Sequence, residues 1–384
     1  MSLLPVVGAP KIADPSFESG SAGTRKFLDE EGFRRMIAIE RKRTERSKEP
    51  FLLMLLEVVN AQGSKSSKST LEGAVTSLLP SIRETDVIGW YKDHAAVGVL
   101  YTGLQARETN VLLTTIQCRV RAALLGELTP DQIDYLVISF HLFPDDWDED
   151  KTGRPTNPAL YPDIFSRENS RRSVMVMKRA MDVIGSAIML MLFAPIFLIV
   201  ALAIKASSKG PVLFRQPRIG LHGQRFTFLK FRSMRVDNDS SVHRAYVTKF
   251  IANDAEHTTP ERDGAKIYKL TNDNRVTRVG KFLRRTSIDE IPQFLNVLMG
   301  DMSLVGPRPP IAYELAVYQT WHRRRVLQVK PGITGLWQVT GRSRVKFDEM
   351  VRMDLRYATS WTPWLDLKIL IKTPLAVVRG NGAC

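Results

Sequence analysis

The sequence predicts an α+β protein in two parts, a soluble α/β domain followed by a domain that carries a long apolar helix. Two patterns support this: helical and strand-like segments alternate over residues 27–142, and residues 183–204 form an uncharged apolar run. Charge is also uneven, because residues 1–170 carry 20 Lys and Arg against 24 Asp and Glu, whereas residues 171–384 carry 35 against 16. A chain of 384 residues is long enough for two domains with separate cores.

The first domain is expected over residues 25–145, with the element order α-β-α-β-β-α-β. Its helices are predicted at about 27–48, 70–83 and 105–125, and its strands at 51–59, 86–91, 95–101 and 135–142. The short turn Lys92-Asp93-His94 predicts a hairpin between the second and third strands.

The segments on either side of this domain have no regular pattern. Residues 1–24, rich in Gly, Ser, Ala and Pro, predict a disordered tail and no signal peptide. Residues 146–172 predict a linker, since Asp, Pro, Asn and Arg occur there without periodicity. The two cysteines, Cys118 and Cys384, suggest no disulfide framework, so a reducing compartment is expected.

The apolar run from Val183 to Ile204 contains 22 uncharged residues, and roughly 20 are enough to cross the hydrocarbon core of a bilayer. Pro195 removes a backbone donor near its middle and predicts a bend. Positive side chains flank both ends: Lys178, Arg179, Lys205 and Lys209. Because positive charge is typical of cytoplasmic ends, the pattern favours a re-entrant helix. A kinked spanning helix and a buried helix of a soluble core are the alternatives.

The positive charge of residues 171–384 indicates a negatively charged partner. DNA, RNA, anionic lipid and phosphorylated substrates all fit, because each attracts clustered Lys and Arg in the same way. The sequence shows no recognised nucleic-acid-reading motif, and such a module is not expected to contain a long apolar run. No nucleic-acid partner is therefore predicted.

The acidic pair Asp289 and Glu290 follows Thr286 and Ser287, which are good helix N-cap residues. Because Pro292 is tolerated only near a helix start, the pair is expected in a first turn. Free N–H groups at such a turn suit a phosphate and keep carboxylates ionised, as a nucleophile or a Mg²⁺ ligand must be. The alternative is a capping box, in which Glu290 only closes the turn after Ser287.

Other basic segments have both a functional and a structural interpretation. Arg308 stands between Pro307 and Pro309, which hold its guanidinium in a stiff loop as a phosphate ligand, unless the loop is merely solvated. The arginine run 323–325 and the amphipathic segment 361–378 are expected either on anionic headgroups or packed on the core.

Six motifs follow one another in the second half of the chain. They are Lys178-Arg179-x-x-Asp182, Phe214-Arg215-Gln216, Lys230-Phe231-Arg232-Ser233-Met234, Thr277 to Gln293, Pro307-Arg308-Pro309 and Lys330 to Val339. Through them the chain resembles the bacterial sugar transferases, also called monotopic phosphoglycosyl transferases, in the larger form whose transferase domain follows an extra module. The resemblance implies a transferase domain over residues 173–384, with its membrane helix at 183–204.

The resemblance also implies residue roles. Asp289 is expected to be the nucleophile that attacks the β-phosphate of a UDP-sugar, and Glu290 to help it hold Mg²⁺. Lys230, Arg284 and Arg308 are expected to bind the substrate phosphates or orient the carboxylates.

The membrane helix of the family is re-entrant and breaks at a proline. This implies a break at Pro195, which follows Ala194 where a serine is common, and a helix that includes Lys178, Arg179 and Asp182.

The function implied by the resemblance is transfer of a hexose-1-phosphate from a UDP-sugar to undecaprenyl phosphate, a polyprenyl phosphate, through a covalent aspartyl-phosphosugar intermediate. This Mg-dependent reaction is the first membrane step of exopolysaccharide, capsule, O-antigen or glycan biosynthesis. It is expected at the bacterial inner membrane, with the active site facing the cytoplasm, and a homodimer is a further expectation. The motifs do not specify the hexose. The alternative, a membrane-anchored scaffold with an inactive domain, is opposed by the intact Asp289, Glu290 and Arg308.

The first domain resembles a degenerate GGDEF domain, the fold of cyclases that make cyclic di-GMP. Residues 92–96 stand where the signature is expected and lack its glycines and metal-binding carboxylate, so no cyclase activity is predicted. Arg83 and Asp86 have the spacing of the inhibitory ligand site of that family, which makes them candidates for a regulatory ligand; a structural pair is the alternative.

Overall fold

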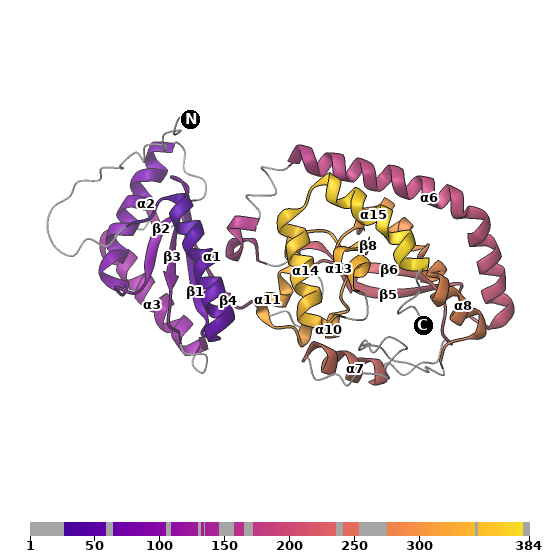
Figure 1. The fold of residues 1–384 in the computed structure, drawn as a ribbon. Helices are drawn as coiled ribbons and strands as arrows, with labels where there is room; N and C mark the ends of the chain where they lie inside the picture. The colour runs from indigo at the N-terminus through magenta and orange to yellow at the C-terminus, as the bar shows by residue number, and fades with distance from the viewer. Residues whose placement is uncertain are drawn as a thin grey trace, which may run out of the picture.

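The computed structural model describes residues 27–58, 64–104, 109–129, 132–133, 135–145, 157–164, 172–235, 241–252, 275–341 and 345–378. The predicted tail lies outside the described residues, as does most of the predicted linker. The described chain forms two bodies of mixed helices and strands (Figure 1), and this confirms the α+β class.

The N-terminal body has the predicted element order. It contains α1 (Glu30–Ser47), β1 (Phe51–Val58), α2 (Ser64–Leu78), the 3₁₀ turn η1 (Leu79–Ser81), β2 (Val87–Lys92), β3 (Ala96–Tyr101), α3 (Thr109–Glu127) and β4 (Leu136–Phe143). Helix α2 begins and ends earlier than predicted, since Pro80 stands at the start of the 3₁₀ turn that follows it.

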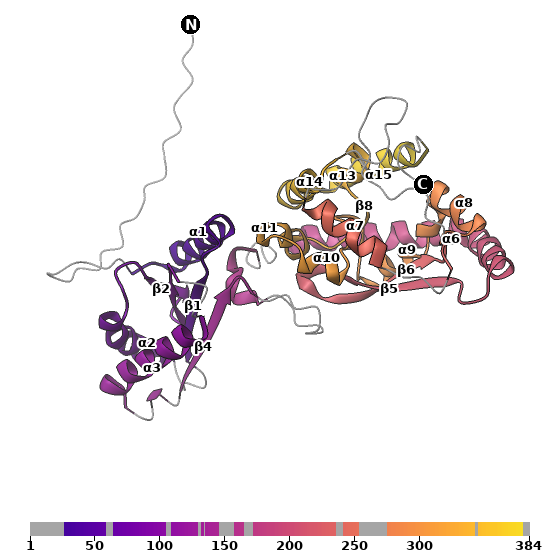
Figure 2. The ribbon, with the colours of Figure 1, turned by 90° about the horizontal axis from the view of Figure 1, so that it is seen from below.

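The four strands form an antiparallel sheet in the order β2-β3-β1-β4. The central strand β1 is apolar on both faces because helices cover both (Figure 2). Leu52, Met54 and Leu56 pack against α2 and α3, whereas Phe51, Leu53 and Leu55 pack with Phe33 and Ile37 of α1. Successive side chains of a strand point to opposite faces, so one apolar strand contributes to two cores.

The second body surrounds two small sheets with helices (Figure 1). Its elements are α6 (Arg172–Ser207), β5 (Leu213–Ile219), η4 (Leu221–Gly223), β6 (Arg225–Phe231), α7 (Ser241–Ile251), α8 (Arg278–Thr286), η5 (Ile288–Glu290), α9 (Gln293–Met299), β7 (Ser303–Val305), α10 (Ala312–Ala316), α11 (Thr320–Arg323), α12 (Arg325–Gln328), β8 (Gly332–Thr334), α13 (Leu336–Thr340), α14 (Phe347–Ser360) and α15 (Pro363–Val378). Strands β5 and β6 form an antiparallel hairpin, and β7 and β8 a short parallel pair.

The two bodies meet at α11 and α12. Leu327 packs in the apolar cluster of Phe33 and Phe51. Nη1 of Arg323 donates to the Asp145 carbonyl at 3.0 Å. Nη1 of Arg324 lies 4.0 Å from Oε2 of Glu45. Of the two alternatives for the arginine run 323–325, packing against protein is therefore the one that the structure shows. Leu160 and Tyr161, inside the predicted linker, are buried in the same cluster.

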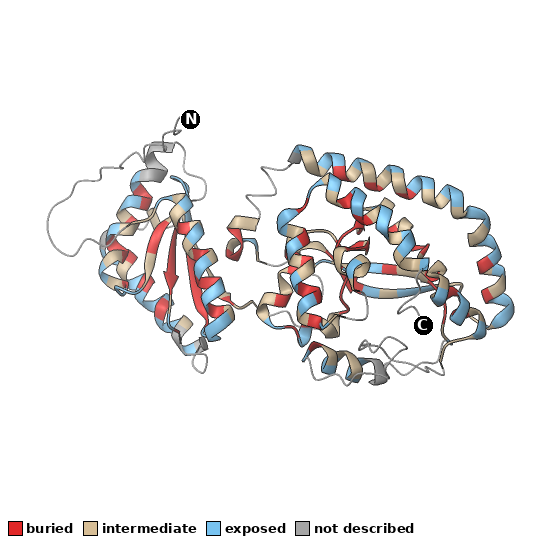
Figure 3. Cartoon of the chain, viewed as in Figure 1, coloured by how far each residue is buried: buried red, intermediate tan, exposed pale blue. Residues whose placement is uncertain are grey.

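Helix α6 is longer than the predicted apolar run and contains Pro195. Figure 1 shows the helix turning sharply along its length, as expected where a proline removes a backbone hydrogen bond. By length and composition, Ser173–Ser207 is the one candidate membrane span among the described residues, and little of it is buried. Figure 3 shows much of its surface exposed. The exposed apolar side chains include Ile184, Met191, Leu198 and Leu202.

The polar residues at the start of α6 attach the helix to the second body. The Lys178 ammonium is buried and donates to Asp366 Oδ2 at 2.6 Å, and Asp182 Oδ1 accepts hydrogen bonds from the side chain of Ser303 and the backbone of Leu304. Lys178, one of the positive residues that precede the apolar run, is thus paired inside the protein with a carboxylate 188 residues away.

Arg179 makes a second attachment, since its guanidinium donates to the carbonyls of Val297 and Leu298 at 2.6 and 2.8 Å. These carbonyls belong to the last turn of α9, where a positive charge is favourable.

The other end of α6 is attached to the same body. Arg232 donates to the carbonyl oxygens of Ser208 and Lys209 at 2.7 and 2.9 Å, just after the helix ends. The two ends of the apolar helix are therefore bonded to the same folded body.

The predicted amphipathic segment 361–378, which contains α15, is in part packed on the protein and in part exposed. Trp361 is buried and its Nε1 donates to Asp366 at 3.0 Å, whereas Trp364 is 61% exposed, with the Lys368 ammonium over its ring. The exposed side chains Leu367, Ile371 and Leu375 continue this apolar surface, so the helix suits an interface with lipid along that side.

We expect the two ends of α6 on the same side of the membrane. In a background with Cys118 and Cys384 replaced by serine, cysteines introduced at the exposed positions Ala180 and Lys209 should both react with an impermeant maleimide from the cytoplasmic face only. Labelling of the two positions from opposite faces would show a spanning helix.

Candidate active site

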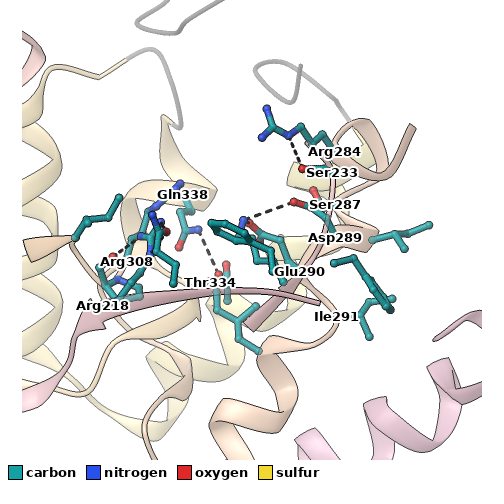
Figure 4. Close-up of a pocket in the computed structure, with 18 of the residues that line it drawn as sticks. Arg218, Ser233, Arg284, Ser287, Asp289, Glu290, Ile291, Arg308, Thr334 and Gln338 are labelled. Atoms are coloured by element: carbon teal, nitrogen blue, oxygen red, sulfur yellow. Dashed lines mark hydrogen bonds and ion pairs between the residues drawn. The ribbon is translucent and has the colours of Figure 1, made fainter. Parts of the chain in front are cut away.

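A cleft of about 2720 Å³ opens in the second body between β5, β6, α7, α8 and the loops before α10 and α13. The cleft is lined by the predicted site residues Lys230, Arg284, Asp289, Glu290 and Arg308. Figure 4 shows the last four of them. Residues from five of the six motifs thus line one cleft, although no local pattern of the sequence fixes their proximity; the motif of Lys178 does not line it.

The acidic pair lies in a tight connection between two helices. Ser287 ends α8 in the left-handed conformation, at φ 58°, Asp289 and Glu290 form the 3₁₀ turn η5, and Pro292 caps α9. The prediction that Pro292 marks a helix start is confirmed. The capping box is wrong, because Ser287 makes no side-chain cap and the Glu290 carboxylate turns to Lys230 instead.

The Lys230 ammonium joins the two carboxylates. Its Nζ lies 2.7 Å from Oε1 of Glu290 and 3.6 Å from Oδ2 of Asp289. Burial raises the pKa of Asp289 above its ordinary value, and the negative Glu290 adds to this effect. Burial alone would also raise the pKa of Glu290, but Lys230, Arg308 and Arg218 together hold that pKa below its ordinary value. The Lys230 ammonium therefore acts on both carboxylates against the cost of burying them side by side.

A close backbone contact places the segment after Lys230 against α8. A Cβ on Gly280 would lie 2.0 Å from the Ser233 carbonyl oxygen, so only glycine lets the helix approach this far. The Thr277 hydroxyl caps α8, and Nε of Arg284 donates to the Ser233 hydroxyl at 3.0 Å. This packing aims Arg284 along the rim of the cleft (Figure 4).

Arg308 lies in the loop between β7 and α10, with an exposed side chain. Its backbone is held from behind, because the buried Arg325 guanidinium donates to the Arg308 carbonyl at 3.1 Å and pairs with Asp354 at 2.7 Å. The proline-bounded loop is thus fixed while the Arg308 guanidinium stays free to reach into the cleft.

Arg218 is a site residue that the sequence analysis missed. It is buried, donates to the Pro309 carbonyl at 2.6 Å, and is held by Gln216 at 3.0 Å. Burial, and secondarily Arg308, lowers its pKa to about 10, so it stays charged at neutral pH. The sequence did hold a signal for Arg218. Side chains of a strand alternate between its two faces, so Arg218 lies on the same face as the motif residue Gln216, two positions earlier.

The acidic pair also faces an apolar cluster. Ile288 and Ile291, on either side of the pair, pack with Phe193, Val200 and Ile204 of α6. The carboxylates therefore lie where the basic cleft meets the apolar helix.

Arg83 and Asp86, the candidate regulatory pair, lie in the other body. The Asp86 carboxylate accepts hydrogen bonds from the backbone N–H groups of Arg83 and Thr102, at 2.9 and 3.3 Å, and so closes the turn before β2. This structural role accounts for the spacing of the two residues, and a regulatory ligand there stays a prediction.

A family model described as bacterial sugar transferase matches residues 173–380, more than half of the chain. The chain belongs to the bacterial sugar transferase family. The match covers α6, the cleft and every predicted site residue of the second body, and the resemblance inferred from the six motifs is confirmed.

Curated relatives have related names. The chain is 41% identical over 220 residues to a galactosyl transferase CpsE of Streptococcus agalactiae, covering 57% of this chain and 46% of the relative. It is 41% identical over 214 residues to an undecaprenyl-phosphate galactose phosphotransferase of Salmonella typhimurium, covering 56% and 43%. It is 39% identical over 206 residues to the exopolysaccharide production protein ExoY of Rhizobium meliloti, covering 54% and 87%. The chain thus spans less than half the length of the first two relatives.

Among solved structures, a DGC protein from Thermotoga maritima matches with 14% identity and a TM-score of 0.25, over 32% of this chain and 86% of that one. A likeness at this level does not decide the fold of the N-terminal body, whose GGDEF-like character stays a prediction.

Proposed function

We propose that the chain transfers a hexose-1-phosphate from a UDP-sugar to undecaprenyl phosphate through a covalent intermediate on Asp289. One observation carries the proposal: the Asp289–Glu290 pair lies between a basic cleft and an apolar cluster that includes α6. A nucleotide sugar needs the first environment and a polyprenyl chain the second. The names of the relatives point to the same reaction.

The donor diphosphate fits the positive groups of the cleft. Arg308 and Arg284 line it, with Arg218 behind the Arg308 loop. Preorganised cations around a reacting phosphate stabilise the charge that builds up in the transition state, without reorganisation at the moment of reaction.

In the proposed chemistry, a carboxylate oxygen of Asp289 attacks the β-phosphorus of the donor. The bond from that phosphorus to the bridging oxygen breaks, and uridine monophosphate leaves with the electron pair. An oxygen of the polyprenyl phosphate then attacks the same phosphorus and releases the Asp289 carboxylate. The two substrates never need the site together, so a soluble donor and a lipid acceptor can visit in turn.

The acidic pair fits a Mg²⁺ ion. Mg²⁺ is usually held by one or two carboxylates, with phosphate oxygens and water as its other ligands. Asp289 and Glu290 supply two such carboxylates in one turn. Among the described residues, no cluster of three or more His, Cys, Asp or Glu side chains occurs. The ion would supply charge neutralisation at the donor phosphates.

The membrane is the proposed location, with the cleft on the cytoplasmic side of the bacterial inner membrane. The exposed apolar surfaces of α6 and α15 support this. The N-terminal body is proposed to regulate or assemble the enzyme, for instance as a homodimer, because every residue that lines the cleft lies between positions 193 and 378.

Asp289→Asn should abolish transfer and also the exchange of labelled uridine monophosphate with the donor, because the amide is a poor nucleophile. The exchange assay in detergent isolates the first step. Asp93→Asn, at an exposed carboxylate of the N-terminal body, is the matched control and should keep the wild-type rate. Exchange at the wild-type rate in Asp289→Asn would contradict the covalent role.

Arg308→Ala should lower the transfer rate by about a hundredfold, since loss of one preorganised donor to a transition state typically costs this much. Arg352→Ala, at an exposed position of α14 outside the cleft, should have little effect. A nearly normal rate for Arg308→Ala, measured with the same UDP-sugar, would show that Arg308 lies in a solvated loop and does not act on the donor phosphates.

A chain beginning near Ser170 should keep measurable transferase activity in detergent. Its thermal stability should be reduced, because Leu327 is uncovered and Arg323 and Arg324 lose the contacts with Asp145 and Glu45. A folded, membrane-inserted truncation with no activity would show that the N-terminal body completes the site.

A further inference from the structure

A small cavity opens off the cleft beside the acidic pair. It is lined by Phe228, Lys230, Glu290, Gln293, Arg308, Pro309, Gly332, Ile333 and Gln338, and most of these residues also line the cleft. Its volume is about 10 Å³, close to the smallest space that holds one water-sized group. A single polar group projecting from a molecule in the cleft fits there.

Two glutamine side chains of this cavity have unsatisfied polar atoms. Nε2 of Gln293 and Oε1 of Gln338 are buried, and neither has a hydrogen-bond partner among the residues that the structure describes. Gln293 as a whole is only 2% exposed. A buried polar atom without a partner is costly, so such atoms usually mark the place of a missing group.

The two glutamines are held in place. Gln293 opens α9 directly after Pro292, so its backbone is fixed by the turn that also positions Glu290. Gln338 lies on α13, and its Nε2 donates to the Ile333 carbonyl at 3.3 Å, which leaves Oε1 as its remaining polar atom. Figure 4 shows Gln338 at the same end of the cleft as Arg308.

The missing group has a definite chemistry. One glutamine offers a donor and the other an acceptor, and a hydroxyl satisfies both because it donates and accepts at once. A phosphate oxygen cannot donate to Oε1, and an ammonium cannot accept from Nε2. The space is too small for more than one such group.

We propose that this cavity binds one hydroxyl of the hexose carried by the donor, and that Gln293 and Gln338 hydrogen-bond it there. The inference rests on the proposed function, since a sugar phosphate attached to Asp289 brings its hydroxyls next to Glu290 and Lys230. A site that hydrogen-bonds a hydroxyl rejects the analogue without it, because its own buried groups are then left unpaired.

The test compares donors and variants of the full chain in detergent. The value of kcat/KM is measured for UDP-glucose, UDP-galactose and the 2-, 3-, 4- and 6-deoxy forms of the preferred donor. For the wild type, one deoxy donor should be at least tenfold poorer than its parent. The variants Gln338→Met and Gln293→Met keep the side-chain volume but remove the amide. In each of them, kcat/KM for that deoxy donor and for its parent should agree to within about threefold.

Gln328→Met is the matched control. Oε1 of Gln328 is also buried without a described partner, but it lies on α12 and lines neither the cleft nor the small cavity. This variant should discriminate between donors as the wild type does. If one of the two cavity variants does not fold, as judged by thermal unfolding, the other tests the same subsite from the opposite wall.

Three results would overturn the inference. If the cavity variants lower kcat/KM by the same factor for every donor, the cavity holds a water molecule or only packs. If no deoxy donor has a lower kcat/KM than its parent in the wild type, the cavity binds no hydroxyl of the hexose. If the wild type transfers no UDP-hexose at all, the proposed function fails and this inference fails with it.

Discussion

The site depends on the contact between the Lys230 ammonium and the two adjacent carboxylates. Like charges on neighbouring residues repel each other, and burial of Asp289 adds a desolvation cost. The Lys230 ammonium, 2.7 Å from Glu290 and 3.6 Å from Asp289, opposes both effects. The same contact joins β6 to η5, so the hairpin and the helices around it are held together at the reacting groups.

Polar contacts with the rest of the second body also hold the apolar helix α6 in place. Lys178 with Asp366, at one end, and Arg232 with the carbonyl of Lys209, at the other, bond the helix to one body. Between these ends its apolar side chains cannot all be covered by protein. The helix contains Pro195 between these attachments, and its side chains Phe193, Val200 and Ile204 form one apolar cluster with Ile288 and Ile291 beside the acidic pair.

The sequence predicted what local patterns encode and missed what distant contacts decide. The alternation of residues 27–142 gave the element order of the N-terminal body, and the uncharged run gave α6. Adjacent Asp289 and Glu290 were found because cations surround them in the sequence itself. The burial of Lys178 had no local signal, since its partner lies 188 residues away, and Ser287 was misassigned because good N-cap residues also end helices.

The contact between the bodies and the support of the phosphate-binding loop share one short stretch. Arg323 and Arg324 face the N-terminal body, whereas the next residue, Arg325, turns inward to the Arg308 carbonyl and Asp354. Because the Arg325 guanidinium is only 2% exposed and already paired inside the second body, that body carries its own support for Arg308. The N-terminal body adds apolar cover over Leu327 from outside. The contact of the N-terminal body with α12 is therefore separate from the contacts that hold Arg308.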